Sequence, residues 1–306
     1  KTEKENIWCG EVGNKTYLKN PKIYLDLTEA QGLIGVKRGG KVSGLRFGYL
    51  LGGMAEMEFA LIKYAQSVIL DQGFTMIVPP VMVKEESMEA MGYLHGGGED
   101  ATYHFAKDKL YLVGTSEQSV GPMHRDEVFR EEDLPKRYLS FSTCFRREAG
   151  SYGKDTKGII RVHQFDKLEM EVFSTAETGL DEHRLLIAIQ EYLVQQLKIQ
   201  YQFVQKCTFD IGKPNASGVD LNCWFPGQKR YIETHTADYM TDYQARDLNT
   251  KVRKQDGSTE LVHTNDATAF ALGRILAAIV ENYQDRDGSI WVPEALKSYL
   301  GGREKI

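Results

Sequence analysis

The chain has 306 residues, of which 42% are hydrophobic, so it can bury a substantial core in one large domain or two modest ones. Its net charge of −5 gives no overall attraction to a phosphate backbone. The four cysteines lack zinc-finger spacing, which predicts reduced thiols and no structural zinc. Because there is neither an apolar run long enough to cross a bilayer nor a signal peptide, we expect a cytoplasmic protein without membrane association.

The N-terminal quarter of the sequence predicts little regular structure before one long helix. The first 48 residues are polar and glycine-rich, and we expect an irregular segment there with a short helix around residues 27–33. Apolar residues then recur at helical spacing over residues 57–73. A strand over residues 74–78 follows and stops at Pro80.

The rest of the chain predicts mainly strands. In chain order they cover residues 109–113, 138–148, 161–173, 201–210, 219–224 and 230–236. The glycine- and lysine-rich residues 149–160 would join two of them as an antiparallel pair. Helices are expected over residues 181–198 and from about 266 to 283. Since the alternation of a parallel sheet is missing, we predict an α+β fold, a mostly antiparallel sheet flanked by helices.

One predicted strand could carry ligand-binding side chains. Alternate residues share a face of a strand, so Arg161, Phe165 and Glu169 would point the same way. They could hold a phosphate, a flat base and an amine or hydroxyl. Arg146 and Glu148 would add a charged pair on the neighbouring strand. An exposed strand face of mixed charge is the alternative interpretation.

Two other places combine polar groups with apolar surroundings. The predicted last helix is apolar nearly all round yet contains Arg274, and a buried guanidinium needs an anionic partner. A triphosphate and a salt bridge to a distant acidic residue are both candidates. Thr115 and Glu117, at the end of an apolar strand, could grip an ammonium group, or could be a turn-forming threonine and a solvated glutamate.

Three of these features occur in an order that resembles motifs 1, 2 and 3 of class II aminoacyl-tRNA synthetases. They are the helix and strand ending at Pro80, the Phe-Arg-x-Glu sequence around Arg146, and the Gly-Arg pair ending at Arg274. From about Lys41 onward, further segments resemble seryl-tRNA synthetases almost word for word: Thr115-Ser-Glu117, Phe145-Arg-Arg-Glu-Ala-Gly150, His163-Gln-Phe-Asp-Lys167, Tyr243-Gln-Ala-Arg246, Glu281-Asn-Tyr-Gln284 and Val292-Pro-Glu-Ala-Leu296. The resemblance implies the class II catalytic fold, with residues 1–40 as an approach segment and residues 41–306 as the catalytic domain.

The resemblance also implies a reaction and its residues. L-serine would react with ATP to give seryl-adenylate, and the seryl group would pass to the 3′ end of tRNA(Ser), in a homodimer. Catalysis would rest on Arg146, Arg274 and Glu233, with Mg²⁺ held by Glu233 and Thr236. Residues implied to bind serine are Thr115 and Glu117 at its amino group, Glu169 and Thr268 at its hydroxyl, and also Ser116 and Arg146. Residues implied to bind ATP are Arg146, Arg147, Glu148, Arg161, Val162, Phe165, Glu233, Thr234, His235, Thr236 and Arg274.

The sequence departs from the seryl-tRNA synthetase pattern in several places. His235, Asp266 and Asn222 stand where the family usually has a serine, an asparagine and an acidic residue. No heptad pattern of the family's tRNA-binding arm is present, and residue 1 is not Met, so we expect a truncated or processed form, with a naturally armless protein as the alternative. The other open hypotheses are a synthetase-like paralogue that serves a carrier protein or another acceptor, and a catalytically dead interaction protein.

Overall fold

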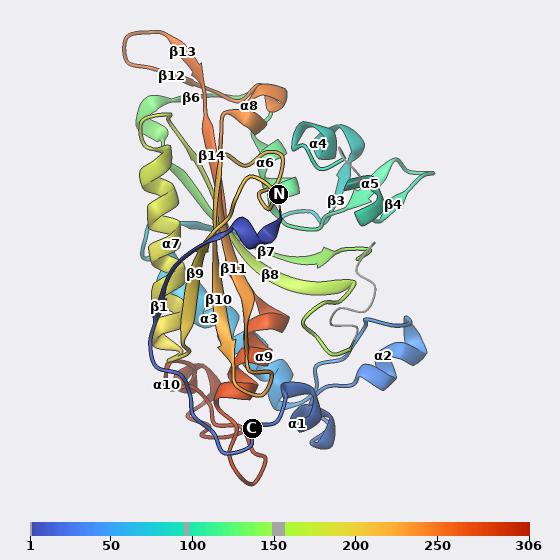
Figure 1. The fold of residues 1–306 in the computed structure, drawn as a ribbon. Coiled ribbons are helices and arrows are strands. Elements are labelled where there is room, and N and C mark those ends of the chain that lie inside the picture. The colour runs from blue at the N-terminus through green and yellow to red at the C-terminus, as the bar shows by residue number, and fades with distance from the viewer. Residues whose placement is uncertain (1, 95–97, 149–156) are drawn as a thin grey trace.

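An eight-stranded sheet organises the computed structural model, which describes residues 2–94, 98–148 and 157–306 (Figure 1). Its strands are β1 (Ile7–Val12), β2 (Thr75–Ile77), β7 (Lys136–Phe145), β8 (Gln164–Ser174), β9 (Tyr201–Gln205), β10 (Ser217–Phe225), β11 (Arg230–Thr241) and β14 (His263–Ala271). Their order is β1-β9-β10-β11-β14-β8-β7-β2. Among the described strands of this sheet, β2 and β7 alone pair in parallel, so the predicted α+β class and mostly antiparallel sheet are confirmed.

Three of the helices pack against the large sheet, and shorter helices lie around it (Figure 1). They are α1 (Tyr24–Ala30), α2 (Val36–Val42), α3 (Gly53–Leu70), α4 (Glu85–Ala90), α5 (Gly98–Ala101), α6 (Glu117–Met123), α7 (Gly179–Gln196), α8 (Tyr243–Leu248), α9 (Leu272–Asn282) and α10 (Glu294–Lys297), with short 3-10 turns at Glu3–Glu5, Glu131–Asp133 and Ser298–Leu300. Figure 1 shows α7 running along the sheet. Apolar residues of α3, α7 and α9 form one buried core with the strands.

Two three-stranded sheets complete the fold. One joins β6 (Val128–Arg130), β12 (Lys251–Arg253) and β13 (Thr259–Leu261), which Figure 1 places at one end of the molecule. The other joins β3 (Met82–Lys84), β4 (His104–Phe105) and β5 (Leu110–Leu112). Because β5 leads directly to the start of α6, this small sheet fixes where residues 114–117 enter the site. Within the described ranges, no helix has the length and apolar character that a membrane crossing requires.

The two faces of the large sheet differ in polarity, because successive side chains along a strand point to opposite faces. On β8, Leu168 and Met170 point into the core under the helices, whereas Glu169 points the other way. On β14, Ala267 packs in the same core and Thr268 lies opposite Glu169. One face of the sheet is therefore apolar, and the other carries the polar side chains of the site.

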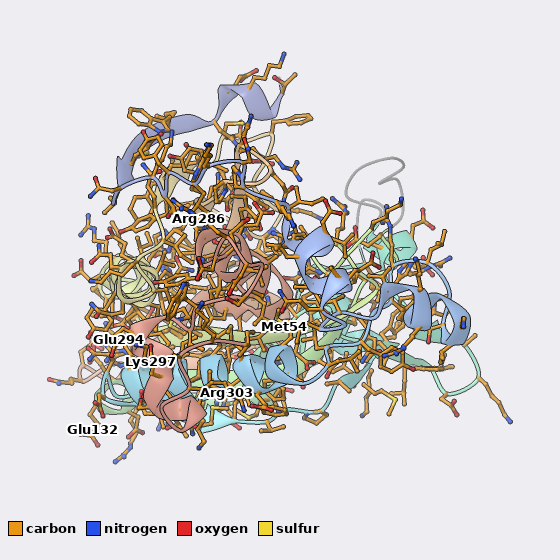
Figure 2. All side chains as sticks on the ribbon, turned by 90° about the horizontal axis from the view of Figure 1, so that it is seen from below. Met54, Glu132, Arg286, Glu294, Lys297 and Arg303 are labelled. Atoms are coloured by element: carbon orange, nitrogen blue, oxygen red, sulfur yellow. The ribbon has the colours of Figure 1, made fainter. Side chains whose placement is uncertain are left out.

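The C-terminal segment is tied to the helices by ion pairs at the surface. Figure 2, which views the molecule from below, labels Glu294 and Lys297 of α10 and Arg303 of the segment after it. Lys297 of α10 pairs with Glu304 at 2.9 Å, and Arg303 reaches Glu56 of α3 at 2.6 Å. Exposed pairs of this kind contribute little individually, so the apolar contacts of α10 supply most of the docking energy.

The N-terminal prediction of irregular structure was wrong in two places. Residues 7–12 form β1, which pairs with β9, and residues 36–42 form α2. Both elements are largely exposed, so neither shows the apolar periodicity on which the prediction depended. The short helix expected around residues 27–33 is α1, which begins three residues earlier.

The predicted last helix began too early. Residues 263–271 form β14, and the helix starts only at Leu272. β14 lies between β11 and β8 and is buried on both faces. Its second half, residues 267–271, consists of small and apolar residues that run into those of the helix, so the periodicity does not separate the two elements. The antiparallel pair β7–β8 is confirmed, but it is shorter than predicted, from residue 136 to 145 and from 164 to 174. Most of the expected loop between them, residues 149–156, lies outside the described residues.

Candidate active site

A cavity of about 100 Å³ opens on the polar face of the sheet, beside the start of α9. A second cavity of about 410 Å³ shares the wall formed by Ile159, Val162, Phe165 and Gly273. Residues predicted from the sequence that line the first cavity are Arg146, Glu148, Arg161, Val162, Phe165, Glu233, Thr234, Thr236, Thr268 and Arg274. The fold thus gathers residues that are more than 120 positions apart in the chain.

An arginine and an aromatic ring form one wall of the cavity. The guanidinium of Arg146 lies 5.3 Å from the ring centroid of Phe165, within cation–π range. Arg146 follows the end of β7, where its backbone N–H donates to the carbonyl of His163 at 3.0 Å and its Nε donates to the carbonyl of Gly114 at 3.1 Å. The wall offers a fixed positive charge beside a flat apolar surface.

The prediction that Arg146 and Glu148 share a strand face was wrong, as was the equivalent prediction for Arg161. β7 ends at residue 145 and β8 begins at residue 164, so these side chains come from the ends of the connecting segment. Glu148 adopts a left-handed backbone conformation with φ of 54°. Its carboxylate accepts a hydrogen bond from the Nε of Arg161 and also lies 3.8 Å from a guanidinium nitrogen of Arg46.

Arg274 and Glu233 face each other across the cavity wall. Nη1 of Arg274 donates to the carboxylate of Glu233 at 2.8 Å and to its backbone carbonyl at 2.9 Å. The salt bridge that the sequence left open is therefore present. Burial opposes ionisation of Glu233, but the charges of Arg274, Lys206 and Arg146 outweigh it and lower the pKa of this carboxyl. Glu233 is ionised at neutral pH.

Glu233 and Thr236 offer oxygen donors of the kind that Mg²⁺ prefers. The Thr236 hydroxyl already accepts a hydrogen bond from Nζ of Lys206 at 2.8 Å, and Lys206 pairs with Asp238 at 2.7 Å. In the described part of the chain, no group of three or more histidine, cysteine or acidic side chains is placed to hold a metal. One carboxylate plus substrate phosphates is a usual Mg²⁺ environment, so the residues fit a metal that arrives with a nucleotide.

The inner end of the site is a buried polar cluster. Nζ of Lys167 pairs with the carboxylate of Glu169 and donates to Oγ1 of Thr115 at 2.9 Å. Thr268 donates to Glu169 at 3.3 Å from the neighbouring strand. All four side chains are buried. A small molecule reaching this end would meet two hydroxyls, one carboxylate and one ammonium group.

Glu117 also belongs to this end of the site, although not as a strand residue. It begins α6, so the predicted strand face shared with Thr115 does not exist. Its carboxylate accepts hydrogen bonds from the hydroxyl of Tyr93 and the amide of Gln244. Burial is the main reason that the pKa of Glu117 is raised, and the charge of Glu169 adds to it. An ammonium group placed here would restore the charged form.

Three further predicted residues belong neither to the cavity lining nor to the contacts of the buried cluster. Arg147 is exposed, and the ring of His235 packs 5.7 Å from that of Phe270 in the core. Burial lowers the pKa of His235 to about 3, so the ring is neutral. The hydroxyl of Ser116 is fully buried and bonded to its neighbours, away from the cavity.

Several residues of the site carry no individual prediction from the sequence. Tyr93 and Lys206 lie in segments without a recognisable motif, so only the fold reveals them. Lys167 and Gln244 belong to segments that the sequence singled out, which was the available signal.

Asp266, one of the departures from the family pattern, is buried among acidic groups. Burial, followed by the charge of Glu117, raises its pKa well above the ordinary range.

Comparison with known proteins identifies similar sequences. Residues 103–283 match the family described as "tRNA synthetase class II core domain (G, H, P, S and T)". A serine–tRNA ligase of Acidothermus cellulolyticus is 42% identical over 300 residues, which cover 98% of this chain and 71% of that protein.

Solved structures agree with the sequence match. A seryl-tRNA synthetase of Pyrococcus horikoshii complexed with ATP superposes with a TM-score of 0.90 at 39% identity, covering 95% of this chain and 65% of that one. A cytoplasmic serine–tRNA ligase of Naegleria fowleri in complex with AMP gives a TM-score of 0.93 at 33% identity, covering 100% and 73%. The chain thus spans about two thirds of the length of these relatives.

Proposed function

The chain belongs to the serine–tRNA ligase family of class II tRNA synthetases, and we propose that its site activates L-serine with ATP and passes the seryl group to the 3′ end of tRNA(Ser). This membership confirms the predicted family and catalytic fold. It also favours the ligase over the hypothesis of a carrier-protein paralogue. The observation that carries the proposal is one cavity with a cation–aromatic wall beside a buried cluster of Glu169, Thr268 and Thr115.

In the proposed first step, a carboxylate oxygen of serine attacks the α-phosphorus of ATP. The bond from that phosphorus to the pyrophosphate oxygen breaks, leaving seryl-adenylate and pyrophosphate. Arg146 would bridge the serine carboxylate and the α-phosphate, and Phe165 would stack on adenine. Arg161 and Arg274 would hold the outer phosphates, with Arg274 turning from Glu233 to the γ-phosphate. Positioning and charge stabilisation supply the catalysis, so no protein nucleophile is needed.

We propose that Glu233 and Thr236 hold Mg²⁺ together with phosphate oxygens. When bound, the metal would neutralise charge that develops on the phosphates. The ionised state of Glu233 supports this role, since the charges of Arg274, Lys206 and Arg146 outweigh desolvation and lower its pKa. Lys206 would keep the Thr236 hydroxyl oriented from the other side.

Selection of serine would take place in the buried cluster. Glu169 and Thr268 would pair with the substrate hydroxyl, while Thr115 and Glu117 would receive its ammonium group. Alanine would leave the first pair without its partner in a buried site, which is costly. Threonine would be excluded by the space available.

We further propose that the chain works as a cytoplasmic homodimer, with residues 41–306 as the catalytic domain and residues 1–40 as the approach segment. Phe59 of α3 and Val78 after β2 are 68% and 74% exposed, which supports a contact surface on this side. Sedimentation at twice the 34.7 kDa mass of the chain is the expected result. A monomer would contradict the dimer.

Hydroxylamine trapping tests the adenylation step. The chain is incubated with ATP, Mg²⁺, serine and hydroxylamine, which converts seryl-adenylate to seryl hydroxamate and AMP. We expect hydroxamate formation that requires both ATP and serine. If AMP and hydroxamate are absent while the protein is folded and binds ATP, the proposed activity is wrong.

A further inference from the structure

Two serines and a glutamate make a closed cluster directly behind the serine site. Glu171 comes from β8, Ser140 from β7, and Ser116 immediately precedes α6. The Ser116 and Ser140 hydroxyl oxygens lie 2.6 Å apart, and they lie 2.9 and 2.8 Å from Oε1 of Glu171. The Ser140 oxygen also lies 3.0 Å from Oε2 of Glu171 and, more distantly, 3.4 Å from the backbone carbonyl oxygen of Glu169. Both serines are fully buried, and Glu171 is 4% exposed.

The number of protons in this cluster determines the charge of Glu171. Three groups in mutual contact make a triangle with three sides, and each side needs one proton between its two oxygens. The two serine hydroxyls supply only two protons. If Glu171 were ionised, one side would bring two oxygen lone pairs together at less than 3 Å. A carboxyl proton on Glu171 completes the triangle.

We propose that Glu171 is a neutral carboxylic acid that closes a hydrogen-bond ring with Ser116 and Ser140 and thereby positions the Thr115–Glu117 segment of the serine site. The carboxyl group donates to Ser140, Ser140 donates to Ser116, and Ser116 donates back to the carboxyl. This inference rests on the proposed function for its effect on serine, but not for the protonation of Glu171.

The charges around Glu171 agree with the proton count. Burial, followed by the charge of Glu169, raises the pKa of Glu171 well above its ordinary range, and the hydrogen bonds from Ser140 and Ser116 and the charge of Lys167 oppose this only partly. Glu117 of α6 and Asp266, which lies opposite Glu171 on β14, add two more acidic groups. A further negative charge among these groups would be costly, whereas a neutral acid adds none.

The ring acts on the site through Ser116. This residue sits between Thr115 and Glu117, whose side chains are the proposed ligands of the substrate ammonium group. Holding the Ser116 hydroxyl between β7 and β8 fixes the turn from which both neighbours project. Glu171 therefore makes no proposed contact with the substrate and is a positioning residue.

Glutamine is the matched replacement, because an amide nitrogen in the place of Oε2, 3.0 Å from Ser140, can donate to that serine while the amide oxygen accepts from Ser116. We expect Glu171→Gln to keep the KM for serine within about twofold of the wild type in pyrophosphate exchange. Glu171→Ala leaves the ring open, so its KM for serine should rise about tenfold or more while the KM for ATP stays nearly constant. An equal rise in both glutamine and alanine variants would overturn the proposal.

Infrared difference spectra test the proton directly and do not depend on activity. The wild-type minus Glu171→Gln spectrum at pH 7 should contain the C=O stretch of a protonated carboxyl group. Glu182→Gln is the buried control, since Glu182 pairs with Arg137 through two contacts of 2.7 Å and should show carboxylate bands. Carboxylate bands for Glu171 would refute the neutral ring. If serine supports no exchange at all, the proposed function fails, while the infrared result still decides the ring.

Discussion

Arg274 has two roles in this account, an ion pair with Glu233 and a proposed contact with the phosphates of ATP. It pairs with Glu233 and would exchange part of that contact for a phosphate. Arg274→Ala should reduce pyrophosphate exchange by about 10²-fold or more, because a positioned cation is lost from the reacting phosphates. Arg130→Ala, which removes an exposed arginine far from the cavity, is the control. Unchanged exchange in Arg274→Ala would exclude the phosphate role.

Thr268 tests how the site would recognise a hydroxyl. Thr268→Val keeps the shape of the side chain but removes the hydroxyl that contacts Glu169. We expect kcat/KM for serine to fall about tenfold or more, with little loss for alanine, because only serine uses the missing group. Thr259→Val on exposed β13 should leave both values unchanged. Equal losses for the two amino acids would argue against hydroxyl recognition at this position.

Glu58 makes stability depend on pH. Burial, followed by the charge of Asp166, raises the pKa of Glu58 from 4.5 to about 7. Between pH 4.5 and about 7 the folded state keeps a proton that the unfolded chain releases, so the free energy of unfolding falls as the pH rises through this range. Above about pH 7 the whole loss of stability is present. Glu58→Gln should add about 1–3 kcal/mol at pH 8 and little near pH 4.5 in denaturant titrations. The same gain at both pH values would contradict a charge effect.

The sequence predicted most residues of the cavity wall but not their local geometry. Arg146, Phe165 and Arg274 could be named because their motifs occur in a recognisable order. The contact partners of Glu117 could not, since Tyr93 and Gln244 reach it from distant segments. Such contacts depend on how elements pack, and no local pattern encodes them.

At the scale of elements, the close approach of α9 to the segment before β8 shapes the cavity. A Cβ at Gly273 would lie 2.6 Å from the backbone carbonyl oxygen of Ile159, so the two segments need a glycine there. Gly273→Ala should lower the free energy of unfolding by about 1–3 kcal/mol through overpacking. It should also raise the KM for ATP.

A second glycine gives the opposite expectation. A Cβ at Gly40 of α2 would meet nothing within 4 Å. Gly40→Ala should therefore raise the free energy of unfolding by about 0.5–1 kcal/mol, since alanine loses less conformational entropy in a helix. If thermal denaturation shows the two variants changing in the same direction, the close-packing argument is wrong.

Elements differ in how well the sequence predicts them. The long helices α3 and α7 have one buried and one exposed face, and their apolar periodicity locates them to within a few residues. β14 lacks that contrast, because both of its faces are buried, so its sequence predicts the start of a helix instead. β1 is exposed at the edge of the sheet and has no apolar alternation, so its pairing with β9 appears only in the fold.

At the scale of the whole molecule, the family membership covers nearly the full chain, and the chain covers about two thirds of the relatives. The cavity wall and the buried cluster belong to the part that matches. Adenylation is therefore the half of the proposed reaction that the cavity wall and the buried cluster support.

The central claim is that this site activates serine. Amino-acid-dependent exchange of pyrophosphate into ATP measures that step directly, with serine, alanine, threonine and glycine compared at equal concentration. We predict rapid exchange with serine and at least about 10²-fold less with each of the others, as expected for a site that pairs buried polar groups with a substrate hydroxyl. Exchange with another amino acid in preference to serine, or no exchange by folded protein with any of them, would contradict the account.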